Sequence, residues 1–173
     1  MEQVILVDTE DNPIGLMEKM EAHEKGLLHR AFSVFIFNDK KELLLQQRAS
    51  HKYHSGGLWT NTCCSHPRDG EGLVDAGTRR LQEEMGFECE IKPILSFIYK
   101  AELDNELTEH EFDHVLIGKF NAAPKPNPDE VSDWKFVDLK VLAEDLKQNP
   151  DQYTIWFQKI FEKTINHFLN EFY

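Results

Sequence analysis

The chain has 173 residues, 40% of them hydrophobic, and a formal net charge of −12. Its length and apolar content fit one folded domain and exclude a disordered chain, and no apolar run approaches the about 20 residues that cross a bilayer. The negative charge argues against nucleic acid as the main partner, because phosphate backbones require a basic protein surface.

The first part of the sequence predicts strands separated by turns. Residues 4–7 form a short apolar run, residues 8–13 are rich in turn formers, and residues 18–24 are compatible with a helical turn. Residues 31–37 are apolar on both faces, which is typical of a central strand. Residues 38–41 indicate a turn and residues 42–47 a second strand that returns beside the first. Residues 50–65 are expected to form a loop.

The middle of the sequence predicts one well-defined helix. Residues 74–85 place apolar side chains at helical spacing, and Gly86 follows as a typical C-terminal cap. Arg80 and Glu84 are four residues apart, so we expect them to share one face beside the apolar stripe. The residues expected to be buried in that stripe are Val74, Gly77, Thr78, Leu81 and Met85.

The last part of the sequence predicts three strands and two helices. Strands are expected at residues 91–99, 114–120 and 134–138, and the prolines of residues 123–128 indicate a rigid loop. A short helix is expected at residues 139–147. A longer amphipathic helix at residues 153–171 is expected to bury Phe157, Ile160, Phe161 and Phe168. This order predicts a single α/β (α+β) domain over residues 1–173, a mixed β-sheet sandwich flanked by helices.

A thiol stands two residues before an imidazole in the segment Trp-Thr-Asn-Thr-Cys-Cys-Ser-His-Pro at residues 59–67. Three interpretations of Cys64 stay open. It is a small buried hydrophobic residue, a zinc ligand together with Cys63 and His66, or a reactive thiol whose pKa is lowered by a metal and basic groups. The reactive thiol is favoured mainly by the family resemblance described below. Three cysteines, two of them adjacent, make a poor disulfide framework, and the first residues lack the features of a signal peptide, so we expect a cytoplasmic protein.

Three histidines and two glutamates form a candidate metal site: His23, His29, His66, Glu109 and Glu111. The two carboxylates project to the same side if their segment is extended. Taken singly, each histidine is more often an ordinary polar or core residue, so the prediction depends on the set. Three neutral imidazoles with two carboxylates suit a divalent ion such as Zn²⁺, Mn²⁺ or Mg²⁺.

Residues 71–87 resemble the Nudix box, G-x5-E-x7-R-E-U-x-E-E-x-G-U, in which U is a bulky apolar residue. The matching positions are Glu71, Arg79, Leu81, Glu83, Glu84, Gly86 and Phe87. Ser65 replaces the first glycine, and Arg80 replaces a glutamate. In Nudix hydrolases the helix carboxylates hold metals that activate water, so a cation at residue 80 weakens hydrolysis and favours binding of a phosphate. A charged surface helix with internal salt bridges accounts for this register less well.

Four cations and one tryptophan are candidates for contact with a substrate. Lys19, Arg48, Lys52 and Arg80 are candidate ligands of an anion, although scattered basic residues are usually solvated. Trp156 falls on the last predicted helix, where most aromatic side chains belong to the core. The alternative for this tryptophan is a ring face turned toward a cation.

Together these residues resemble those of the type I isopentenyl diphosphate isomerases, a non-hydrolytic family of the Nudix superfamily. The resemblance covers nearly the whole chain, including residues 28–33, residues 59–67, the altered Nudix helix, Tyr99 and the Glu109-x-Glu111 pair. It implies isomerisation of isopentenyl diphosphate to dimethylallyl diphosphate through a tertiary carbocation, as a step of isoprenoid biosynthesis. The implied partner is a small isoprenoid diphosphate, without nucleic acid or membrane, and the implied assembly is a monomer or weak dimer.

The resemblance also implies a role for each candidate residue. One divalent metal (Zn, Mn or Mg) would be held by His23, His29, His66, Glu109 and Glu111. A Mg²⁺ that bridges the substrate diphosphate would be held by Glu84, with a backbone oxygen near Cys64. The diphosphate would be bound by Lys19, Arg48, Lys52 and Arg80, and its hydrocarbon end would lie under Trp156. The two proton-transfer groups would be Cys64 and Glu111, with Tyr99 hydrogen-bonded beside Glu111, and their order as acid and base stays open.

Two other functions stay open on the sequence. A Nudix pyrophosphohydrolase would share the fold, Glu83 and Glu84, and would release phosphate or pyrophosphate from a nucleotide or similar diphosphate. A non-catalytic Nudix-like domain would keep the core but need no metal ligands. The arginine at residue 80 and the combination of cysteine, histidines and glutamates favour the isomerase over both.

Overall fold

The structure is a computed structural model of the chain, and it describes residues 1–172. The strands are β1 (Gln3–Val7), β2 (Pro13–Glu18), β3 (His29–Phe37), β4 (Glu42–Arg48), β5 (Trp59–Thr60), β6 (Cys63–Ser65), β7 (Ile91–Glu102), β8 (Thr108–Lys119) and β9 (Val131–Asp138). The helices are α1 (Lys19–Lys25), α2 (Leu73–Met85), α3 (Leu139–Gln148) and α4 (Ile155–Phe172), with 3-10 turns at Asp104–Glu106 and Pro150–Gln152.

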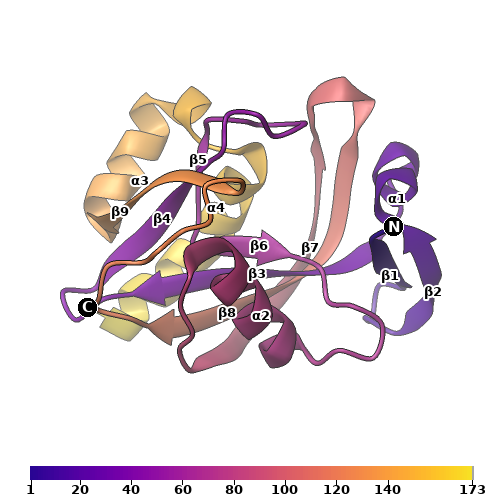
Figure 1. The fold of residues 1–173 in the computed structure, drawn as a ribbon, viewed down its shortest axis with the longest axis horizontal. Helices are drawn as coiled ribbons and strands as arrows, with labels where there is room; N and C mark the ends of the chain where they lie inside the picture. Colours follow the sequence, from indigo (N-terminus) through magenta and orange to yellow (C-terminus); the bar gives the residue numbers. More distant parts are fainter. Residues whose placement is uncertain (173) are drawn as a thin grey trace.

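Strand β3 is the central strand of a nine-stranded mixed sheet, and it crosses the middle of the molecule (Figure 1). Along one edge it pairs with β8 in parallel, from His29 opposite Glu111 to Phe37 opposite Lys119. Along its other edge, three strands follow one another: β1 at its start, β6 in its middle and β4 at its end. The start of β3 therefore lies next to strands that come from distant parts of the sequence.

Both faces of β3 are buried because helices cover both faces of the sheet. Phe35 and Phe37 point into a core that α3 and α4 complete, where Phe168 contacts both of them. Phe32 and Ile36 point to the opposite face and pack with residues of α2. In Figure 1, α2 lies in front of the sheet and α4 behind it. This arrangement confirms the predicted mixed sandwich and the prediction that residues 31–37 form a central strand.

The C-terminal end of α2 is fixed by a glycine and by the loop that follows β8. Gly86 has a left-handed φ of 72°, and its N–H donates to the carbonyls of the last helical turn. A Cβ at this position would collide with the backbone of Lys125, so glycine is required twice over. The predicted rigid loop over residues 123–128 docks here, since the N–H of Lys125 donates to the carbonyl of Met85 at 2.9 Å.

Several local predictions need correction. Val74 is 41% exposed, so the buried stripe of α2 is made by Ala76, Gly77, Leu81, Glu84 and Met85. Strand β2 was not expected, because its side chains are mostly exposed and show no apolar alternation. Residues 50–65 were expected to be a loop but contain β5 and β6, which are too short to give a periodic pattern. Strand β8 begins at Thr108 rather than at residue 114. Its first inward-facing residues are buried carboxylates, so the sequence shows no apolar alternation there.

Candidate active site

A cavity of about 700 Å³ opens beside the start of β3. The residues to which the family resemblance gives a role all line it except His29, which is completely buried. The lining candidates are Lys19, His23, Arg48, Lys52, Cys64, His66, Arg80, Glu84, Tyr99, Glu109, Glu111 and Trp156. These residues span more than a hundred positions of sequence, and the fold brings them to one place.

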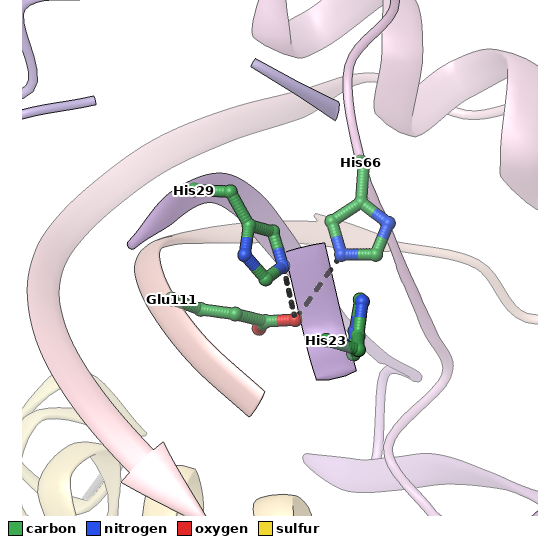
Figure 2. A group of neighbouring side chains, drawn as sticks. All are labelled: His23, His29, His66 and Glu111. Atoms are coloured by element: carbon green, nitrogen blue, oxygen red, sulfur yellow. Dashed lines mark hydrogen bonds and ion pairs between the residues drawn. The ribbon is translucent and has the colours of Figure 1, made fainter. Parts of the chain in front are cut away.

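Four of the predicted metal ligands form one cluster. His29 and Glu111 are directly paired in the register of β3 and β8, while His66 follows β6 and His23 lies on α1. One ligand atom from each of these side chains lies within 4.8 Å of the others. Figure 2 shows the rings of His29 and His66 directed at one oxygen of Glu111, with His23 beside them.

Backbone carbonyls fix the orientation of two of the imidazoles. His23 Nδ1 lies 2.7 Å from the carbonyl of Lys19, and His29 Nδ1 lies 2.8 Å from the carbonyl of Leu27. A carbonyl can only accept, so Nδ1 carries a proton in both rings and Nε2 is the nitrogen left to face the cluster. Such support of the outer nitrogen is typical of histidines that bind metals.

The electrostatics of the cluster also suit a cation. Burial, and then the neighbouring His66, lower the pKa of His23 to about 4, so its imidazole is neutral at pH 7. Burial acts to raise the pKa of Glu111, but the imidazoles of His29 and His66 hold it below its usual range. His29 Nε2 lies 3.6 Å from Glu111 Oε1 and has no hydrogen-bond partner among residues 1–172. The neutral imidazole of His23, the ionised carboxylate of Glu111 and the unpartnered buried nitrogen of His29 fit a divalent ion.

Glu109 lies beside this cluster but outside the group of four ligand atoms. It projects from β8 to the same side as Glu111, as the extended pair predicts, and the hydroxyl of Tyr99 bonds both carboxylates, at 2.8 and 2.7 Å. Burial, and then the charge of Glu111, raise the pKa of Glu109 well above its usual range. A ligand role for Glu109 stays a prediction.

Cys64, rather than its neighbour, faces the cavity. Successive residues of a strand point to opposite faces, and Cys63 is fully buried in the core under α2. The Cys64 thiol donates to Asn61 Oδ1 at 3.0 Å. Burial, and then the carboxylate of Asp113, raise the pKa of this thiol. This direction is opposite to the lowered pKa expected of a reactive thiol, because burial and the charge of Asp113 outweigh the hydrogen bonds of Ser33 and Asn61, which lower the pKa.

Two of the predicted anion ligands are paired with carboxylates of the cavity wall. Lys19 Nζ lies 2.9 Å from Glu2 Oε2, and Lys52 Nζ contacts the carboxylate of Glu130. Neither glutamate was recognised in the sequence, because each is distant in the chain from the cation that it meets. An incoming anion must compete with these carboxylates or arrive with a cation of its own.

Arg80 and Glu84 confirm the predicted shared face of α2. The guanidinium of Arg80 bonds Glu84 directly and Glu83 at 2.5 Å, while its Nε is buried without a hydrogen-bond partner among the described residues. Glu84 is 6% exposed and also accepts from Gln46 at 2.7 Å. The arginine thus turns toward the cavity with unused hydrogen-bonding capacity.

Arg48 and Trp156 meet at the far wall of the cavity. The Arg48 guanidinium lies 5.1 Å from the centre of the Trp156 ring, and its Nη2 donates to the carbonyl of His54 at 3.3 Å. The His54 ring stands edge-on to Trp156 at 5.5 Å. Burial, and then the charge of Arg48, lower the pKa of His54 to about 4. Trp156 is 3% exposed and packs in the hydrophobic core while the Arg48 guanidinium lies over its ring, and a role for this ring toward a substrate stays a prediction.

Three further residues of the site were missed in the sequence: Ser33, Asn61 and Asp113. Asp113 continues the alternation of Glu109 and Glu111, so the period of a strand could have found it. Asn61 lies within the motif at residues 59–67. For Ser33, only the pairing of β3 with β6 gives a signal, and the sequence does not contain it.

Comparison with known proteins places the chain in a family. The model of the NUDIX domain matches residues 27–157. The chain is 52% identical over 162 residues to "Isopentenyl-diphosphate Delta-isomerase" of Burkholderia multivorans, covering 94% of this chain and 92% of that protein. It is 57% identical over 159 residues to "Isopentenyl-diphosphate Delta-isomerase 2" of Photorhabdus laumondii, covering 92% and 90%.

Solved structures support the fold. The DR0079 protein of Deinococcus radiodurans superimposes with a TM-score of 0.77 at 17% identity, covering 94% of this chain and 98% of that one. The MutT protein of Methanosarcina mazei superimposes with a TM-score of 0.64 at 20% identity, covering 81% and 94%. At these identities the likeness establishes the fold alone. Within residues 1–172, no helix has the length and apolar character that a membrane crossing requires.

Proposed function

This chain belongs to the NUDIX domain family and, within it, to the isopentenyl-diphosphate Delta-isomerases, and on that basis we propose that it converts isopentenyl diphosphate to dimethylallyl diphosphate in isoprenoid biosynthesis. The observation that carries the proposal is the cavity, in which a thiol, a cluster of imidazoles and carboxylates, and four cations meet. A hydrolase of the same fold needs its cations and helix carboxylates but has no use for the thiol.

The reaction needs two proton-transfer groups. An unactivated alkene has no acidic proton and no leaving group, so the accessible route adds a proton at the terminal carbon and forms a tertiary carbocation. Loss of a proton from the neighbouring methylene then moves the double bond. We assign these transfers to Cys64 and Glu111, which line the same cavity from β6 and from β8. Tyr99 and His66 hold the two oxygens of Glu111 from different sides, at 2.7 and 3.2 Å.

The metal ligands proposed for the first site are His23, His29, His66, Glu109 and Glu111. The neutral imidazole of His23 and the ionised carboxylate of Glu111 support this assignment. A divalent ion (Zn, Mn or Mg) held there supplies positive charge that stabilises ionised carboxylates and adjusts the acidity of its ligands. Independently of the ion, the backbone carbonyls that orient His23 and His29 keep this wall of the cavity rigid.

The diphosphate is proposed to bind the four cations that line the cavity, Lys19, Arg48, Lys52 and Arg80. These four cations offset the repulsion that a net charge of −12 exerts on an anionic substrate. Glu84 is proposed to bind a Mg²⁺ that neutralises part of the diphosphate charge. The head group lies away from the reacting carbons, so its binding energy serves to position them.

A tertiary carbocation must be protected from water, which would trap it as an alcohol. Trp156 is proposed to cover the hydrocarbon end, where its ring stabilises a cation by about 1–2 kcal/mol. The ring is 3% exposed and already has the Arg48 guanidinium 5.1 Å from its centre. We further propose that the enzyme acts in the cytoplasm as one domain over residues 1–173, as a monomer or weak dimer, without nucleic acid or membrane. Three free cysteines support a reducing compartment.

The test supplies isopentenyl diphosphate with Mg²⁺ and with Mn²⁺ or Zn²⁺, and follows the organic product and free phosphate by NMR. We expect dimethylallyl diphosphate without phosphate release. The alternative, a Nudix pyrophosphohydrolase, would release phosphate or pyrophosphate from a nucleotide or other diphosphate. Cys64→Ala and Glu111→Gln are expected to abolish turnover while the circular dichroism stays that of the parent. Isomerisation by Cys64→Ala at the parental rate would show that the thiol has another role.

A further inference from the structure

Asp113 is a buried carboxylate that the proposed chemistry does not use. It is 0% exposed, and its Oδ1 accepts a hydrogen bond from the Ser33 hydroxyl at 3.0 Å. Its Oδ2 has no hydrogen-bond partner among residues 1–172, and the ion pairs of the described residues include none to Asp113. A buried carboxylate with one hydrogen-bond donor and no cation nearby lowers the stability of the fold, which indicates a functional rather than a stabilising role for Asp113.

The strand register links this carboxylate to the thiol of Cys64. Ser33 on β3 is directly opposite Cys64 on β6, and its Oγ lies 3.4 Å from the Cys64 sulfur. On the other edge of β3, Asp113 on β8 bonds the same hydroxyl. Asp113 lies two residues after Glu111 and points to the same face of the strand. A bridge from Asp113 through Ser33 to Cys64 therefore crosses three strands and joins the strand of Glu111 to that of the thiol.

The direction of these hydrogen bonds is defined. Ser33 donates its only proton to Asp113, so it offers an oxygen lone pair to the sulfur of Cys64. On the other side of the sulfur, the amide nitrogen of Asn61 donates to two backbone carbonyls, at 3.1 and 2.9 Å. This fixes the amide, so its Oδ1 must face the sulfur. The single proton of the thiol can therefore bond one of two oxygens at a time, Asn61 Oδ1 at 3.0 Å or Ser33 Oγ at 3.4 Å, and the positions of both oxygens are set by other groups.

We propose that Asp113 is a positioning residue which, through Ser33, fixes the sulfur of Cys64 relative to Glu111. The proposal rests on the roles proposed above for Cys64 and Glu111. Two groups that act on the two carbons flanking the cationic carbon of one substrate must keep a constant separation, and a displacement of 1 Å costs on the order of 100-fold in rate. The bridge ties together the two strands that carry them.

The test is a double-mutant cycle on turnover of isopentenyl diphosphate, with Ser33→Ala, Asp113→Ala and the double variant. Each single change is expected to lower kcat at least about 10-fold and to leave KM near the parental value, because the cations that bind the head group are untouched. Since Asp113 acts through Ser33, adding Asp113→Ala to Ser33→Ala is expected to have no further effect. Asp113→Asn keeps an acceptor for Ser33 and is expected to restore most of kcat.

A matched control is Thr164→Val, which removes a buried hydroxyl that bonds a backbone carbonyl inside α4. It is expected to keep the parental kcat. Multiplicative losses in the double variant, or a parental kcat in Ser33→Ala, would overturn the proposal, and the second result does so even if Asp113→Ala does not fold. Failure of the proposed function looks different, because the parent protein itself would then not isomerise the substrate.

Discussion

Removal of the Tyr99 hydroxyl tests the carboxylate wall of the site. The side chain is 7% exposed, and its hydroxyl lies 2.8 Å from Glu109 Oε2 and 2.7 Å from Glu111 Oε2. Phenylalanine keeps the ring and the packing, so Tyr99→Phe removes little more than these contacts.

The magnitude follows from the number of protons. One hydroxyl donates to one carboxylate at a time, so the change removes one hydrogen bond to a charged group, which contributes about 1.5–3 kcal/mol. We therefore expect the free energy of unfolding of the metal-free protein to fall by about 2 kcal/mol. Glu111 then keeps the contact of its Oε1 with His66 but loses the one on its Oε2. Because the Glu111 carboxylate can then rotate about its remaining contact, Tyr99→Phe is expected to lower kcat at least about 10-fold.

The assay combines urea denaturation in the presence of a chelator with steady-state turnover of isopentenyl diphosphate. Tyr153→Phe is the matched control, since its hydroxyl also bonds a carboxylate, that of Asp145, outside the cavity. The control is expected to turn over at the parental rate. A Tyr99→Phe protein with the parental kcat would refute the reasoning, because Glu111 would then not depend on this hydroxyl for its position.

Three further predictions follow from other walls of the cavity. Arg80→Glu restores the glutamate of the Nudix box. It is expected to raise KM for isopentenyl diphosphate at least about 10-fold, because a charge-assisted contact with the diphosphate becomes a repulsion. An unchanged KM would exclude Arg80 from diphosphate binding. His29→Ala is expected to weaken binding of Mn²⁺ or Zn²⁺, as measured by equilibrium dialysis. Loss of a residue that only orients a metal ligand costs about 10- to 100-fold in affinity, and loss of a ligand itself is expected to cost more. Parental affinity would contradict the ligand assignment. The pKa of His54 is lowered to about 4, so between pH 7 and pH 4.5 the unfolded chain takes up a proton there that the folded protein does not. As the pH decreases over this range, the free energy of unfolding should therefore decrease by about 2 kcal/mol because of this group. Urea denaturation at both pH values measures the decrease. If a His54→Gln protein loses as much stability as the parent, another group causes the loss.

Periodicity predicted the parts of the fold in which one residue pattern decides the outcome. The buried run at residues 31–37 became the central strand because no solvated face was available to it. Gly86 ended α2 because its left-handed φ suits glycine. The Glu109 and Glu111 pair faces one way because strand side chains alternate. In each case the cause lies within a few residues of the pattern.

Long-range pairing accounts for what the sequence did not predict. Val74 has the right spacing for the buried stripe, but it lies in the first turn of α2, where the side chain stays 41% exposed. The raised pKa of Cys64 depends first on burial and then on Asp113, which lies on β8, on the other side of β3. The partner of Lys52, Glu130, comes from a position 78 residues away. None of these contacts has a local signature in a single sequence.

Deuterium incorporation tests the central claim most directly. Isopentenyl diphosphate is incubated in deuterated water with the parent protein and with Cys64→Ala, and the products are followed by ²H and ³¹P NMR. The account predicts deuterium in a methyl group of dimethylallyl diphosphate, an intact diphosphate, and no label with Cys64→Ala. Release of phosphate by the parent protein, or label appearing equally with the alanine variant, would contradict it.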